Sequence, residues 1–67
     1  MESQEVEIMD RLKSQFFEGL VVKKTAIKAR DIYNKYSGDK ITYCMCSSVQ
    51  RKVYAKLFID WYEKENR

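Results

Sequence analysis

The chain has 67 residues, of which 45% are hydrophobic and 34% charged, and a net charge of +3. This composition is typical of one small folded domain, and it excludes a disordered chain. No apolar run approaches the roughly 18 residues that span a bilayer, and the first ten residues are acidic where a secretory signal would be basic. We therefore expect a cytoplasmic protein that forms a single helical domain over residues 1–67 and has no membrane partner.

The first predicted helix covers residues 3–19. Ser3 is a candidate N-cap, and Gly19 is a candidate end, because glycine readily adopts the left-handed conformation that terminates helices. Apolar residues recur there every three or four positions and predict one buried stripe: Val6, Met9, Leu12, Phe16 and Leu20.

A second helix is predicted from Thr25, as its cap, to the Ser37–Gly38 pair. Its lysines fall on the side opposite the apolar residues, which is the usual arrangement for a helix on a protein surface. The expected buried face consists of Ala26, Ala29, Ile32, Tyr33 and Tyr36, and the expected outer face carries Lys24, Lys28 and Lys35.

The third predicted helix begins at a capping box, Ser47-x-x-Gln50, and runs to about residue 65. Apolar residues repeat behind this box every four positions, which predicts an inward face of Val49, Val53, Leu57 and Trp61. With that face inward, the rotation of about 100° per residue turns four other residues outward: Ser48, Arg51, Lys52 and Ala55.

Two short stretches outside these helices, residues 20–23 and 40–45, are rich in β-branched and aromatic residues. They flank the second helix, so they can pair as a minimal two-stranded patch. The predicted fold class is therefore all-α or mostly α, with three helices and this small patch as an addition.

Charge is distributed unevenly along the chain. Residues 1–10 hold four acidic and no basic residues, whereas residues 11–56 hold eleven Lys or Arg and three acidic residues. Scattered lysines most often form a solvated surface, but basic residues at a helix N-terminus are also suited to phosphate binding. The candidate nucleic-acid-binding residues are Lys28, Lys35, Ser47, Ser48, Gln50, Arg51, Lys52 and Lys56.

The order of a helix from Thr25, a turn with Gly38 and a further helix opening SSVQRKV resembles helix-turn-helix DNA-binding domains over residues 25–56. The resemblance implies that the last helix enters the major groove of double-stranded DNA by its N-terminal residues. The interval of about nine residues, 38–46, is longer than the usual turn of three or four, which indicates a variant with an inserted strand. The pattern CxCSS…RK…WYE also resembles small bacteriophage proteins.

Cys44 and Cys46 supply two of the four ligands of a structural zinc site, and the chain has no histidine and no other cysteine to complete one. A four-thiolate site between two copies and a strained disulfide are the alternatives. The simplest interpretation is that both thiols are small, partly buried residues beneath the third helix, and we expect no metal or cofactor.

Two functions are compatible with the sequence. We expect no enzyme, because the chain lacks histidine and has only two glycines. The first hypothesis is a nucleic-acid-binding domain, as a homodimer or in a larger assembly. The second is a protein-interaction module, such as a phage-encoded inhibitor or adaptor of a host protein or a small virion or packaging component.

Overall fold

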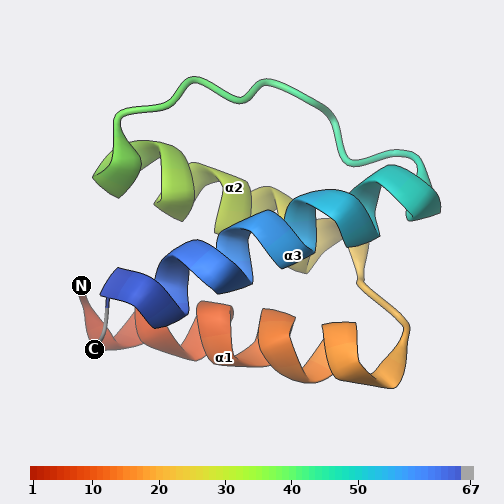
Figure 1. Cartoon of the computed structure of the whole chain (residues 1–67), viewed down its shortest axis with the longest axis horizontal. Helices are drawn as coiled ribbons and strands as arrows, with labels where there is room; N and C mark the ends of the chain where they lie inside the picture. Colours follow the sequence, from red (N-terminus) through yellow and green to blue (C-terminus); the bar gives the residue numbers. More distant parts are fainter. Residues whose placement is uncertain (66–67) are drawn as a thin grey trace.

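The computed structural model describes residues 1–65 and contains three helices: α1 (Ser3–Glu18), α2 (Lys23–Ser37) and α3 (Ser48–Glu65). As predicted, the fold is compact and all-α. The helix α3 lies across α1 and α2, and a long loop returns from the end of α2 to the start of α3 (Figure 1). Each helix contacts the other two, so the three helices share one core.

The core is formed by the facing sides of the three helices and by two residues outside them. The prediction is confirmed for Met9 and Leu12 on α1, whereas Leu20 is exposed. It is also confirmed for most of the α2 face, with Tyr36 exposed. Among residues 1–65, eleven hydrophobic residues are buried: Met9, Leu12, Val21, Ala26, Ala29, Ile32, Tyr33, Met45, Ala55, Phe58 and Ile59.

The orientation predicted for α3 is wrong. Val49, Val53 and Leu57 are exposed, whereas Ala55, which we expected outside, is fully buried. Of the predicted inward face only Trp61 packs against the core. The other side chains that face the core lie on the opposite side of the helix and are larger, because they include Phe58 and the partly buried rings of Tyr54 and Tyr62. Phe58 and Trp61 both contact Tyr33 of α2, with ring centroids 5.1 and 5.3 Å apart. Apolar area is buried most effectively by turning these rings inward.

The ends of α1 and α2 are as predicted, but their starts differ. Gly19 and Gly38 adopt the left-handed conformation, with φ of 80° and 82°, and close the two helices. The N-caps are Glu2 and Val22 in place of Ser3 and Thr25. At the start of α1 the Glu5 side chain accepts from the Glu2 backbone N–H, and at the start of α2 Thr25 is buried. Local chemistry therefore predicts the ends of these helices better than their starts.

The two-stranded patch is not formed, because residues 1–65 contain no strand. Side chains of α2 instead form hydrogen bonds with the backbone of residues 40–45, which we expected to pair as a strand. The Asn34 amide donates to the Ile41 carbonyl and accepts from the Ile41 N–H, at 2.9 and 3.1 Å. Arg30 donates to the Tyr43 carbonyl at 2.8 Å. These bonds satisfy the polar backbone of the loop without a partner strand.

A polar contact joins the start of α1 to the end of α2. The hydroxyl of Tyr36 donates to the Glu5 carboxylate at 2.6 Å, and Lys35 approaches the same carboxylate at 3.3 Å. The hydrogen bond from Tyr36 is the largest of the interactions that lower the pKa of Glu5 to about 2. Glu5 therefore stays ionised in the folded protein at pH values where a free carboxyl group takes up a proton.

Candidate functional site

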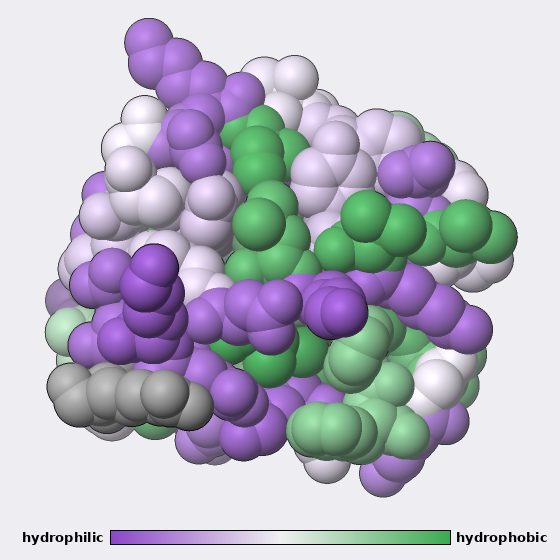
Figure 2. Space-filling view, in the orientation of Figure 1, coloured by the Kyte–Doolittle hydropathy of each residue, from purple (hydrophilic) through white to green (hydrophobic). Residues whose placement is uncertain are grey.

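The outer face of α3 carries an apolar stripe, Val49, Val53 and Leu57, which we call the outer stripe. These side chains are 68%, 60% and 43% exposed. At 1.5 Å of rise per residue, a stripe from residue 49 to residue 57 is about 12 Å long. Figure 2 shows hydrophobic side chains gathered over this part of α3, beside a hydrophilic band.

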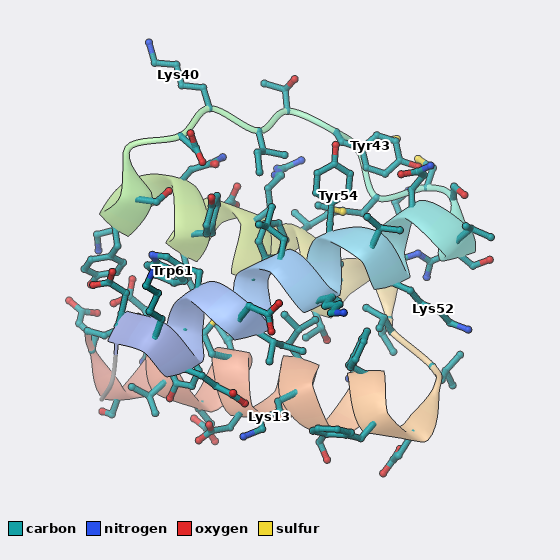
Figure 3. The ribbon with its side chains drawn as sticks, viewed as in Figure 1. Lys13, Lys40, Tyr43, Lys52, Tyr54 and Trp61 are labelled. Atoms are coloured by element: carbon teal, nitrogen blue, oxygen red, sulfur yellow. The ribbon has the colours of Figure 1, made fainter. Side chains whose placement is uncertain are left out.

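Lysines flank the outer stripe. Lys52 and Lys56 are exposed and follow Val49 and Val53 by three residues, so each lies beside the stripe on the helix surface. Figure 3 shows Lys52 extending away from α3 into solvent. Within residues 1–65 no carboxylate forms a salt bridge with either lysine. The segment 47–59 contains no acidic residue, so the potential beside the stripe is positive.

The start of α3 exposes most of the other residues that we predicted as a nucleic-acid site. Ser47, Ser48 and Gln50 are exposed there with the two lysines. The Ser47 hydroxyl accepts from the Gln50 N–H at 3.4 Å, which is one half of the predicted capping box. Lys28 and Lys35, the two predicted residues of α2, are also exposed. Lys35 binds Glu5 at the end of α2, which is remote from the start of α3 (Figure 1), and Lys28 lies in the middle of α2. The predicted nucleic-acid-binding residues that lie close together are therefore those of the segment 47–56.

Arg51 is the exception, because it does not point outward as we expected. Its guanidinium is partly buried and donates from Nη1 to the Val21 carbonyl at 3.0 Å and from Nη2 to the Cys46 carbonyl at 3.4 Å. These bonds join α3 to the α1–α2 connection and to the preceding loop. In this position Arg51 holds the start of α3 in place and is not available as a guanine or phosphate contact.

The loop before α3 is anchored by Tyr43 and Met45. The ring of Tyr43 stacks on Tyr54 of α3, with centroids 5.3 Å apart (Figure 3), and its hydroxyl accepts from the Ser47 N–H at 2.9 Å. Met45 is fully buried and has a φ of 60°, which costs an L-residue backbone energy. Together these residues fix where α3 begins.

The expectation that both cysteines are partly buried is wrong. Cys44 and Cys46 are exposed and reduced, and the residue between them occupies the core instead. A hydrogen bond from the Cys46 thiol is the largest cause that lowers the pKa of Cys44. Among residues 1–65 no group of three or more metal-ligating side chains is present.

A second apolar area lies at the end of α1 and in the α1–α2 connection. Phe17, Leu20 and Val22 are exposed there. Figure 2 shows further hydrophobic side chains over the end of α1, on the other side of the hydrophilic band from the outer stripe. The bond from Arg51 to Val21 places this connection next to the start of α3.

The outer stripe was not predicted from the sequence, because its residues were assigned to the core. A competing pattern was present in Tyr54, Phe58 and Tyr62, which also repeat every four residues and have larger side chains. Comparing the side-chain volumes of the two patterns would have favoured the orientation that the structure has.

Comparisons with known proteins identify no relative: no family model, curated protein or solved structure matches this chain. None of the helices described here is long and apolar enough to cross a membrane. Residues 1–65 enclose no pocket.

Proposed function

We propose that this chain is a protein-interaction module and that it binds its partner through the outer face of α3. The observation that carries the proposal is the exposure of Val49 and Val53 in the N-terminal half of that face. Contiguous exposed apolar side chains with a polar rim are typical of protein-binding surfaces. The rigid attachment of α3, through Arg51 and the Tyr43–Tyr54 stack, limits the ordering cost of binding.

Site-specific photocrosslinking in the cells that make the protein tests this function. A benzophenone amino acid in place of Val53 is expected to give a discrete protein adduct. The same amino acid in place of Gln4, which is exposed on α1, serves as the matched control and is expected to give none. The adduct should disappear when Val49→Ser is added. The absence of a protein adduct at position 53, or an equal adduct at position 4, would refute the proposal.

A nucleic-acid-binding domain is the second candidate function. The observation that favours it is the exposed group of Ser47, Ser48, Gln50, Lys52 and Lys56 in the first half of α3 and just before it. Lysines beside a helix N-terminus and small hydroxyl groups are suited to phosphate contacts. The absence of Arg51 from this group weakens the case, because arginine is the side chain that most often reads guanine.

A titration of fluorescent duplex DNA at several salt concentrations separates the two candidates. Nucleic-acid binding predicts an affinity that falls steeply with salt and is lost in Lys52→Glu/Lys56→Glu but kept in Val49→Ser/Val53→Ser. The interaction module predicts no binding beyond a weak, salt-sensitive association that does not depend on the valines. Tight duplex binding that survives the serine substitutions would favour the second candidate over the first.

A further inference from the structure

The shape of the outer face of α3 indicates the form of its partner. The outer stripe is a row of side chains on a convex helix, with a spacing of four residues and a length of about 12 Å. A second helix matches such a row, because its own side chains at positions i, i+4 and i+8 fit between those of the first helix. An added strand is less suitable, because residues 1–65 provide no sheet edge for it.

The charge beside the stripe indicates the chemistry of the partner. Among the lysines of residues 1–65 only Lys13 and Lys35 form salt bridges, with Glu63 and Glu5 at 2.9 and 3.3 Å, so most lysine charges are open to a partner. What sets Lys52 and Lys56 apart is their position beside the exposed outer stripe. Lys52 and Lys56 have no such partner within residues 1–65. Carboxylates placed beside an apolar seam would complement these two charges and speed the encounter.

We infer that the outer stripe docks an acidic amphipathic helix of a partner protein, with Val49, Val53 and Leu57 against its apolar face and its carboxylates beside Lys52 and Lys56. This inference rests on the proposed function and specifies the partner class. A second copy of this chain fits less well, because two copies of the surface around residues 47–59 would bring positive charges together.

Two synthetic helical peptides with the same leucine face test the inference. One carries glutamates beside the leucines and the other carries lysines, and a scrambled glutamate peptide controls for net charge. We expect the protein to bind the glutamate helix at least tenfold more tightly than either of the others, measured by fluorescence anisotropy at physiological salt. The excess over the scrambled peptide shows whether the helical arrangement, and not charge alone, is recognised.

Two variants assign the binding to the surface. Lys52→Glu/Lys56→Glu should reverse the preference, so that the lysine helix binds more tightly. Val49→Ser/Val53→Ser should weaken the glutamate helix at least tenfold, while Gln4→Ser, on the exposed side of α1, should change nothing. Circular dichroism checks that each variant keeps the helical content of the parent protein.

The outcomes distinguish the inference from the proposed function. Equal binding of the glutamate and lysine helices, lost in the serine variant, would overturn the acidic partner and leave the protein-binding face in place. Binding that is unaffected by the serine variant, or no binding of either helix, would overturn the inference. The crosslinking at position 53 would then decide the proposed function by itself. Self-association that requires Val53, detected by sedimentation velocity, would replace the acidic helix by a second copy.

Discussion

The two faces of α3 have similar apolar character and opposite environments. The inner face places Ala55, Phe58 and Ile59 in the core, whereas the outer face leaves Val49 and Val53 to solvent. What distinguishes the faces is side-chain volume and the presence of rings on the neighbouring elements, above all Tyr33 and Tyr43. Hydrophobicity alone therefore does not decide which side of a helix is buried when both sides are apolar.

Phe58→Ala, on the inner face of α3, should lower the stability of the protein more than any other substitution considered. The side chain is fully buried and contacts Tyr33, so its removal leaves a cavity and should lower the free energy of unfolding by about 3–5 kcal/mol. Leu57→Ala, on the adjacent outer position, should cost less than about 1 kcal/mol. Urea denaturation followed by circular dichroism measures both. A larger cost for Leu57→Ala than for Phe58→Ala would mean that α3 is oriented as the sequence pattern predicted.

Arg51 and Lys52 are adjacent basic residues in different environments, and the substitution Arg51→Met tests this difference. It removes the donors to the Val21 and Cys46 carbonyls, and it should cost about 1–3 kcal/mol, because these groups lose a charged partner. Lys52→Met should stay within about 0.5 kcal/mol, because Lys52 is exposed and lacks a salt-bridge partner within residues 1–65. The same denaturation experiment applies. A neutral Arg51→Met would show that the two carbonyl bonds do not hold α3.

Glu5→Gln tests how much the polar contact between α1 and α2 stabilises the protein. The folded pKa of Glu5, about 2, lies below the ordinary value of 4.5, because Tyr36 and Lys35 favour the ionised form. The stabilisation is therefore present above about pH 4.5 and is lost as the pH falls towards 2. Unfolding free energies measured from pH 6 to pH 2 should fall more steeply for the parent protein than for the variant. Parallel curves would contradict this assignment.

The smallest expected effect concerns Cys44 and Cys46, the two exposed cysteines on either side of the buried Met45. The pKa of Cys44 is lowered chiefly by the Cys46 thiol, so a larger fraction of Cys44 is thiolate at neutral pH. Cys46→Ala should therefore slow the alkylation of Cys44 by iodoacetamide at pH 7, measured by mass spectrometry, without changing stability. An unchanged rate would show that Cys46 does not activate its neighbour.

The fold was predictable to the extent that it depends on local chemistry. Gly19 and Gly38 end their helices because glycine tolerates positive φ, and the apolar spacing of α1 and α2 identifies Met9, Leu12 and Ala29 as core residues. These assignments depend on residues within a few positions of each other.

The candidate site was less predictable, because its geometry depends on contacts between distant parts of the chain. Arg51 turns inward and donates to the carbonyl of Val21, which lies 30 residues earlier in the chain. No local sequence pattern predicts that partner. The rotation of α3 follows from rings on α2 and in the loop, which a single-helix pattern does not include. The exposure of Lys52 was nevertheless predicted correctly, and lysine side chains favour the surface even when the helix is rotated.

The replacement of a partner strand by helix side chains has a consequence for the order of folding. Arg30 and Asn34 are four residues apart, so they align to hold Tyr43 and Ile41 only after α2 is helical. The loop in turn supplies the Tyr43 hydroxyl that binds the first residue before α3. We therefore expect α2 to form early, the loop to order against it, and the first turn of α3 to be completed late. Val49, in that first turn, would then reach its final position after Val53 and Leu57, and it would be the first residue of the outer stripe to loosen when α2 is destabilised.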